Sequence, residues 1–118
     1  MTQHLPLSDQ ALELIAHRFK LLSEPTRLRI LQLLMGGEKS VTELVQAMQT
    51  TQANVSKHLG ILADGGLVAR RKEGVSTFYR IADPSLTTLC NLVCASLQER
   101  SEEVALILKP PAEEAGEA

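Results

Sequence analysis

A pair of glycines, Gly65 and Gly66, separates two patterns that belong to different kinds of secondary structure. Before the glycines, three apolar residues recur at the spacing of one helical face: Val55, Leu59 and Leu62. After them, residues 67–72 and 76–81 are rich in strand-forming side chains and flank a turn around Gly74. The chain is therefore expected to combine helices with one β-hairpin.

Three further helices are predicted before this one. Ser8 has the side chain of an N-cap, and Pro25 suits a first helical position. Ser40 and Glu43 have the spacing of a capping box, which predicts a short helix to about Met48. Each start is followed by apolar residues at helical spacing, so three separate helices are expected in this part of the chain.

One long helix is predicted after the hairpin. Asp83 and Pro84 provide an N-cap and a first-turn proline, and an apolar stripe follows: Leu86, Leu89, Cys90, Val93 and Leu97. This helix is expected to reach about Leu108, and residues 109–118, which lack periodicity, to form a disordered acidic tail. The predicted fold is a mainly α domain with a small β-hairpin wing (α+β), over residues 1–108 in the order α-α-α-α-β-β-α.

The order helix, short helix, tight turn, helix and hairpin indicates a winged helix-turn-helix. Thr50 or Thr51 caps the glycine-terminated helix, whose face opposite the apolar stripe is small and polar. A helix that enters the major groove needs such a slim face, with amide and hydroxyl groups that can read base edges. Lysine and arginine side chains can neutralise phosphates. The predicted residues that bind double-stranded DNA are Thr51, Gln52, Ala53, Ser56, Lys57, Arg70, Arg71 and Lys72.

The charge distribution agrees with this interpretation better than the net charge of −2 does. Residues 52–80 hold five basic side chains and two acidic ones, whereas residues 98–118 hold six glutamates and two basic side chains. The net charge of the chain is therefore negative only because the acidic C-terminal region outweighs a basic central segment.

Composition excludes several other classes of protein. No apolar run approaches the ~18 residues of a membrane span, and the N-terminus lacks the layout of a signal peptide. We therefore expect a cytoplasmic protein without a membrane partner, whose two cysteines are kept reduced. Serine, histidine and carboxylate residues show no catalytic spacing, and no glycine-rich loop precedes a helix, so an enzyme is not expected.

Three segments carry a resemblance to a known family: LLSEPTRLRILQLL (21–34), SVTELVQAM (40–48) and QANVSKHLGILADGGLVARRKEGVSTFYRI (52–81). In combination they resemble the ArsR/SmtB family of winged-helix repressors. The resemblance implies a homodimer built from the first and last helices, a palindromic operator, and a ligand that weakens DNA binding. The expected dimer interface comprises Leu12, Ile15, Phe19, Leu86, Leu89, Val93 and Leu97.

The ligand sites of that family are where this sequence departs from it. The short helix SVTELVQAM lacks the C-x-C type motif of many arsenic- and cadmium-sensing members. Asp83 matches one residue of the family's zinc site, but Ser85 and Ser96 stand at the histidine positions. The three histidines, which we expect to be surface or packing residues, are His4, His17 and His58.

Cys90 and Cys94 remain as candidate sensors, because their i, i+4 spacing places both thiols on one face of the last helix. A disulfide between them would be strained, whereas a soft metal ion or arsenite could be shared by two sulfurs. Four thiols could converge across a dimer axis, and a disulfide between protomers or a persulfide bridge with extra sulfur atoms is also open. No cofactor is expected to be obligatory, and these ions are the candidate ligands.

The stripe around the two thiols is apolar and no Lys or Arg lies within a turn, so we expect no activating neighbour within the helix. We therefore expect a thiophilic ion or a reactive sulfur species as inducer, in preference to peroxide. His17 is the one residue we can name that could approach from another element. Two alternatives stay open: a repressor with purely structural cysteines and another control input, and a winged-helix module that docks a protein partner.

Overall fold

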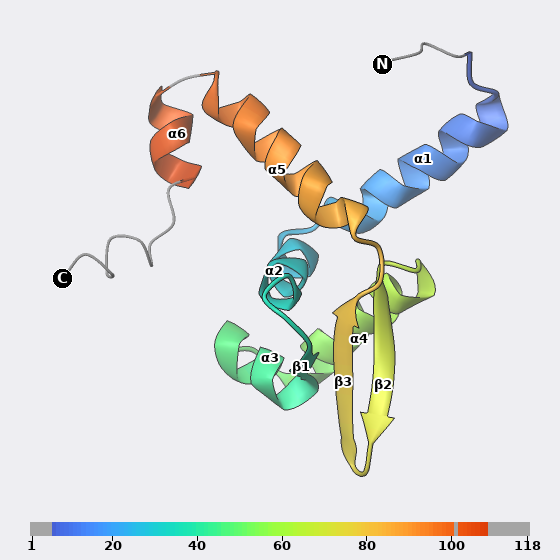
Figure 1. Cartoon of the computed structure of the whole chain (residues 1–118), viewed down its shortest axis with the longest axis vertical. Coiled ribbons are helices and arrows are strands. Elements are labelled where there is room, and N and C mark those ends of the chain that lie inside the picture. The colour runs from blue at the N-terminus through green and yellow to red at the C-terminus, as the bar shows by residue number, and fades with distance from the viewer. Residues whose placement is uncertain (1–5, 101, 109–118) are drawn as a thin grey trace. The chain divides into compact units, whose positions relative to one another are not determined.

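The computed structural model of the chain describes residues 6–100 and 102–108, which form two compact units divided after Asp83. Figure 1 shows their helices and strands, which are α1 (Asp9–Leu22), α2 (Pro25–Leu34), β1 (Lys39–Ser40), α3 (Val41–Met48), α4 (Gln52–Asp64), β2 (Val68–Glu73), β3 (Ser76–Ile81), α5 (Ser85–Gln98) and α6 (Glu102–Leu108). The winged helix-turn-helix is confirmed and lies in the first unit. The predicted order is incomplete, because it lacks β1 and α6.

Side-chain caps fix where three of the helices begin. The hydroxyl of Ser8 accepts a hydrogen bond from the Ala11 N–H at 3.0 Å, and that of Thr51 accepts one from Asn54 at 3.1 Å. The second bond identifies the cap of α4, which the sequence left open between two threonines. The capping box at α3 is also confirmed, with Ser40 and Glu43 bonded reciprocally.

The start of α2 combines the predicted proline with a carboxylate cap. Pro25 is the first helical residue, and the Glu24 carboxylate accepts a hydrogen bond from the Thr26 N–H at 2.7 Å. Desolvation raises the pKa of Glu24, but backbone hydrogen bonds from Thr26 and Arg27 outweigh it, so the pKa is lowered overall. Glu24 is therefore held in the ionised form that caps the helix.

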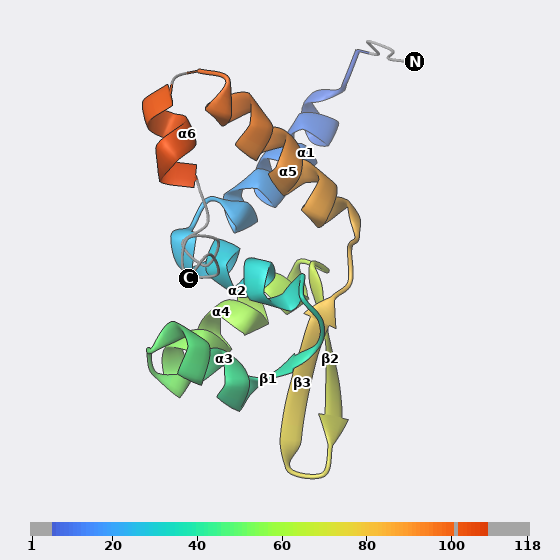
Figure 2. The same ribbon diagram turned by 60° about the vertical axis from the view of Figure 1, so that its left-hand side comes forward.

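Aliphatic side chains build the core of the first unit. The predicted stripe of α4 is confirmed, since its three residues are fully buried. Among the described residues of this unit, the buried apolar side chains are Leu21, Leu22, Ile30, Leu31, Leu34, Leu44, Val55, Leu59, Leu62, Leu67, Val68 and Tyr79. They join α2, α3, α4 and the base of the hairpin into the support on which the outward face of α4 is presented (Figure 2).

The two glycines that end α4 have different roles. Gly66 has a φ of +78°, and the Leu67 N–H bonds back to the Leu62 carbonyl at 3.0 Å, which forms a Schellman motif. Gly65 has an ordinary φ, but a Cβ there would collide with the side chain of Leu21 at the end of α1. One glycine permits the left-handed turn, and the other permits close packing of α4 against α1.

The sheet is antiparallel with the strand order β1-β3-β2. The hairpin pairs Glu73 with Ser76 across a two-residue turn, and Gly74 supplies the positive φ of +64° that such turns require. Figures 1 and 2 show the hairpin projecting beyond the helices of the first unit. At its base, β1 adds only two pairs, Lys39 with Tyr79 and Ser40 with Phe78.

The prediction of one long C-terminal helix is wrong. The second unit contains α5 and α6, and both views show α6 as a separate short helix that follows a reversal of the chain after α5 (Figures 1 and 2). Residues 98–103 hold no apolar side chain, so nearly two helical turns have nothing to bury. After Gln98 the Arg100 N–H bonds to the Leu97 carbonyl, an i→i−3 bond that tightens the end of α5.

The start of α5 also differs from the prediction by one residue. The helix begins at Ser85, and Pro84, which cannot supply a side-chain cap, takes the N-cap position. Asp83 instead forms an ion pair with Arg18 of α1, with 2.8 Å between Nη1 and Oδ2. The last residue of the first unit is thereby tied to its first helix.

Among the helices described, none has the length and apolar character that a membrane span requires. His4 and the predicted tail at 109–118 lie outside the described residues. A single domain over 1–108 stays a prediction, because the two units are described separately.

Candidate nucleic-acid interface

The outward face of α4 has the predicted character. All five predicted DNA-binding residues at the start of this helix are exposed: Thr51, Gln52, Ala53, Ser56 and Lys57. Behind them, the Asn54 amide donates a hydrogen bond to the Thr50 hydroxyl at 3.3 Å, which stiffens the entry to the helix. The first turns of α4 therefore present small polar groups and one cation to solvent, while the opposite face is anchored in the core.

The turn between α3 and α4 sets how this face is presented. Gln49 follows α3 with a φ of +54°, in the left-handed region, and its N–H bonds to the Val45 carbonyl at 2.9 Å. This closes α3 in one residue. The compact reversal brings the helices into contact and leaves the N-terminus of α4 at the surface.

Strand alternation divides the basic side chains of β2 between the two faces of the wing. Arg70 and Lys72 lie on the same face as Val68, which is buried against the helices, and as Tyr79, the partner of Arg70 on β3. Arg71 lies on the opposite face. Arg70 and Lys72 are exposed, so the face that packs on the helices at its base becomes basic towards the tip.

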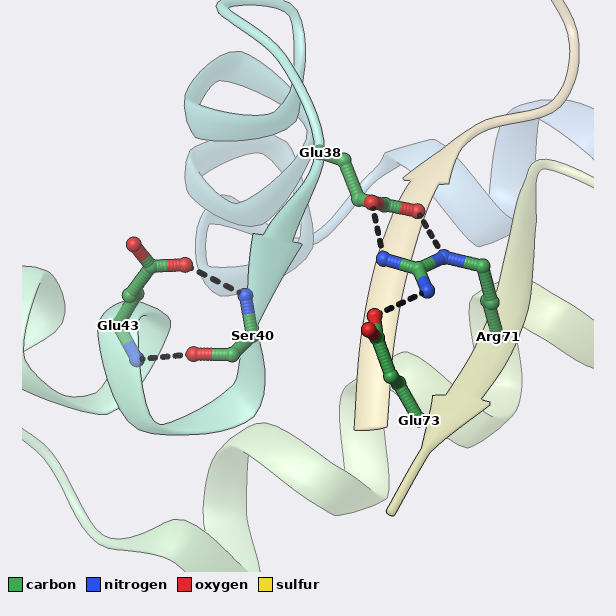
Figure 3. A network of polar contacts seen from close by, with 5 residues as sticks. All are labelled: Glu38, Ser40, Glu43, Arg71 and Glu73. Carbon is green, nitrogen blue, oxygen red and sulfur yellow. Dashed lines mark hydrogen bonds and ion pairs between the residues drawn. The ribbon is translucent and has the colours of Figure 1, made fainter. Parts of the chain in front are cut away.

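Arg71 belongs to a polar network that we call the wing strap, formed by Glu38, Arg71 and Glu73 (Figure 3). The guanidinium binds both oxygens of Glu38, with Nε–Oε2 at 3.1 Å and Nη2–Oε1 at 2.8 Å. Its Nη1 binds Glu73 at 2.6 Å, and its carbon lies 4.7 Å from the centre of the Phe78 ring. The two carboxylates and the ring therefore engage the guanidinium on several sides.

The strap also shifts the titration of its members. The hydrogen-bonded Arg71 guanidinium lowers the pKa of the Glu38 carboxyl, and Glu38, followed by Glu73, raises the pKa of Arg71. Both groups are consequently charged at neutral pH.

Within the described residues, Lys57, Arg70 and Lys72 form no ion pair, whereas Arg71 forms two. The sequence grouped these cations together and missed Glu38. No local signal identifies Glu38, because it precedes a two-residue strand and its partner is 33 residues away.

A second arginine, Arg27, connects α4 to the helices behind it. Its Nε donates to the Leu21 carbonyl at 2.7 Å, at the end of α1, and its Nη1 lies 3.3 Å from Nδ1 of His58. The sequence predicts that His58 is a surface or packing histidine. It is 6% exposed, which confirms that it is a packing residue. An arginine always donates, so a hydrogen bond between these two side chains requires Nδ1 to accept. We call this contact set the Arg27 junction.

Cys90 and Cys94 lie one turn apart on α5, half-buried, and neither is in a disulfide. Among the residues that the structure describes, no cluster of three or more cysteine, histidine or carboxylate side chains could hold a metal. His17 is exposed on α1, which belongs to the other unit. Its part in thiol chemistry stays a prediction.

Apolar side chains remain exposed on both predicted dimer helices. On α1, Phe19 is 53% exposed, and the others are Leu12, Leu14 and Ile15. On α5 the strongly exposed residues are Leu92 and Val93, while Leu89 and Leu97 are half-buried. Leu86 differs from the other predicted interface residues, because it is 1% exposed already in the single chain.

The chain is similar in sequence to known transcriptional regulators. Residues 22–71 match a family model described as a helix-turn-helix domain. The chain is 39% identical over 83 residues to an uncharacterized HTH-type transcriptional regulator, Rv0081 of Mycobacterium tuberculosis, covering 70% of this chain and 73% of the relative. It is 38% identical over 77 residues to a probable mercury resistance operon repressor of Streptomyces lividans, covering 65% of this chain and 62% of that protein.

Solved structures agree with these sequence matches. The crystal structure of Rv0081 superposes with a TM-score of 0.72 at 35% identity, covering 78% of this chain and 93% of that one. The solution structure of a fragment of Mb0332 from Mycobacterium bovis, residues 1–100, has a TM-score of 0.71 at 33% identity, covering 85% of this chain and 93% of the fragment. Mb0332 is described as a homodimeric winged helix-turn-helix DNA-binding domain and a possible ArsR-family regulator.

Proposed function

Because the chain belongs to the ArsR/SmtB family of winged-helix transcriptional regulators, we propose that it is a homodimeric repressor of a palindromic operator. The observation that carries the proposal is the outward face of α4, where small polar side chains surround one lysine. Gln52 would present its amide to a base edge, and Lys57, Arg70 and Lys72 would neutralise phosphates.

The homodimer is supported by the apolar residues that the first helix leaves uncovered. Leu12, Ile15 and Phe19 of α1 are all more than 40% exposed, which is unusual for three large apolar side chains on one short helix. Val93 on α5 offers a further apolar contact. The relative Mb0332 is homodimeric, and a two-fold dimer would place two α4 helices about one turn of DNA apart.

For the inducer, we propose a thiophilic ion or a reactive sulfur species that acts at Cys90 and Cys94. Both thiols are partly accessible, and their i, i+4 spacing lets one ion bridge two sulfurs. A two-coordinate ion such as Hg(II) would be satisfied within one protomer and would replace both thiol protons. Arsenite takes three thiolates, so its third would come from the dimer partner. A relative is a probable mercury resistance repressor, which favours this chemistry.

The proposal is tested with a DNA duplex that the parent protein selects from a random pool. Fluorescence anisotropy then follows release of the duplex during separate titrations with Hg(II), arsenite, polysulfide and peroxide. The parent should release DNA with a thiophilic ion or polysulfide, and the Cys90→Ser, Cys94→Ser double variant should not. Ser96→Ala, on the same helix, serves as the matched control and should behave like the parent.

Two results would contradict the proposal in different ways. Release of the double serine variant at the parent's inducer concentrations would make the cysteines structural and leave DNA binding intact. If instead the parent enriched no sequence and bound no duplex at low salt, the DNA-binding function itself would be rejected, in favour of a module that docks a protein partner.

A further inference from the structure

The wing strap crosses the whole three-stranded sheet. Arg71 of β2 pairs with Phe78 of β3, and Phe78 pairs on its other side with Ser40 of β1. The Arg71 side chain passes over the Phe78 ring and reaches Glu38, two residues before Ser40. One side chain therefore links the outer strand of the wing to the segment that leads into α3 (Figure 3).

The position of this link matters because little else holds β1 to the wing. Strand β1 contributes only two residue pairs, and a ladder of this length is weak on its own. Ser40 also caps α3, the first helix of the helix-turn-helix, through the capping box with Glu43. A bond at Glu38 therefore acts on the angle between the wing and the helices that present α4.

The basic side chains on the two faces of β2 have different surroundings. Arg70 and Lys72 are exposed on the face continuous with the helices, whereas Arg71 is held on the other face by two carboxylates. We propose that Arg71 is a positioning residue and not a phosphate contact, and that with Glu38 it fixes the wing so that Arg70 and Lys72 meet the DNA backbone. The proposal rests on the DNA-binding function proposed above.

For the substitution Glu38→Gln, a pure charge effect and a loss of wing positioning predict opposite changes in DNA affinity. Glu38→Gln removes a negative charge beside a DNA-binding wing, so charge alone would strengthen binding to any duplex. If the carboxylate positions the wing, the same substitution should weaken binding, because an amide cannot hold the guanidinium with two charge-assisted bonds. We expect affinity to fall about 2- to 5-fold, in the range measured for exposed ion pairs.

Substitutions of the arginines separate the two roles through the salt dependence of binding. Each phosphate contact contributes about 0.9 to the slope of log affinity against log salt, so Arg70→Gln should lower the slope by about twice that in a dimer. Arg71→Gln should weaken binding with the slope unchanged. Arg71→Lys keeps the charge but loses the fork that binds both Glu38 oxygens, and should resemble Arg71→Gln.

The experiment measures the affinity of the full-length parent and these four variants for the selected duplex across a range of salt concentrations. Circular dichroism melts verify that each variant is folded. Equal or tighter binding by Glu38→Gln, or a loss of slope in Arg71→Gln that matches Arg70→Gln, would overturn the proposal.

A measurement without DNA distinguishes a failure of the strap from a failure of the proposed function. Carboxyl NMR should show the pKa of Glu38 below its usual value in the parent and returned to it in Arg71→Gln. An unshifted Glu38 in the parent would reject the strap itself. A parent that showed the shift but bound no duplex would reject the DNA-binding function, and with it the positioning role.

Discussion

Two arginines each join three segments of the first unit, but in different surroundings. At the Arg27 junction the partners are a backbone carbonyl at the end of α1 and the imidazole of His58 on α4, which is buried. At the wing strap Arg71 binds two carboxylates, and its side chain is 42% exposed. The comparison indicates a helix-turn-helix held in part by an arginine on uncharged backbone and a buried ring, which salt barely screens, and a wing held by exposed charges that salt and acid weaken.

Removal of the Arg27 side chain should lower the stability of the protein more than loss of the strap does. Arg27→Met keeps most of the side-chain volume but leaves the Leu21 carbonyl and Nδ1 of His58 without their donor. The free energy of unfolding should fall by about 2 kcal/mol, as for other hydrogen bonds to charged groups. Urea unfolding measures it. Arg29→Met, an exposed site on the same helix, is the control, and an equal loss there would contradict the junction.

A double-mutant cycle isolates the contact between Arg27 and His58, whose coupling energy should be smaller than the full effect of Arg27→Met. Arg27→Met, His58→Leu and the pair together should give a coupling energy of about 1 kcal/mol, because either single change already breaks their contact. Urea unfolding of the four proteins supplies the values. Strict additivity would show that the 3.3 Å approach between the two side chains contributes nothing to stability.

The strap should behave differently, with effects confined to the wing. Arg71→Met should change the midpoint of cooperative unfolding much less than Arg27→Met does, but should speed amide exchange in β3, whose pairing with β1 it supports. High salt should reproduce this faster exchange in the parent, since exposed charges are screened. Faster exchange spread over α4 as well would show that the wing and the helices are not independent.

Acid should break the ion pair between Glu38 and Arg71, and the direction of this pH dependence follows from the pKa of Glu38. Arg71 lowers that pKa below its usual 4.5, so the folded carboxyl binds protons less readily than the unfolded one. The stabilisation is therefore complete above pH 4.5 and is lost as the pH falls through the lowered value. Amide exchange of the wing, taken relative to the intrinsic exchange rate at each pH, should accelerate in the parent between pH 6 and pH 3. Glu38→Gln should not show this step.

Local chemistry explains which parts of the fold could be predicted from the sequence. The caps at Ser8, Ser40 and Thr51 each bond to a backbone N–H three residues away, so their signals lie within one helical turn. The buried stripe of α4 and the hairpin turn at Gly74 also depend on short spacings. These elements were predicted within a residue or two.

The features that sequence reasoning missed depend on distant partners. Strand β1 has only two residues and exists because β3 pairs with it, and Glu38 meets Arg71 across 33 residues. The break between α5 and α6 reflects the absence of an apolar anchor over residues 98–103, which the prediction of a helix to about Leu108 did not take into account. For the candidate site, composition identified the cations of the wing, but only the fold shows that Arg71 is engaged by carboxylates.

One pair of variants separates the two proposed roles, in which α4 reads base edges and the wing holds the DNA backbone. Anisotropy gives the ratio of affinities for the selected duplex and a shuffled duplex, for the parent, Gln52→Ala and Arg70→Gln. Gln52→Ala should lower the ratio about 10-fold with affinity for the shuffled duplex unchanged, because a lost base contact removes discrimination only. Arg70→Gln should weaken binding to both duplexes equally. A ratio that Gln52→Ala left at the parent's value would contradict the assignment of α4 as the reading helix.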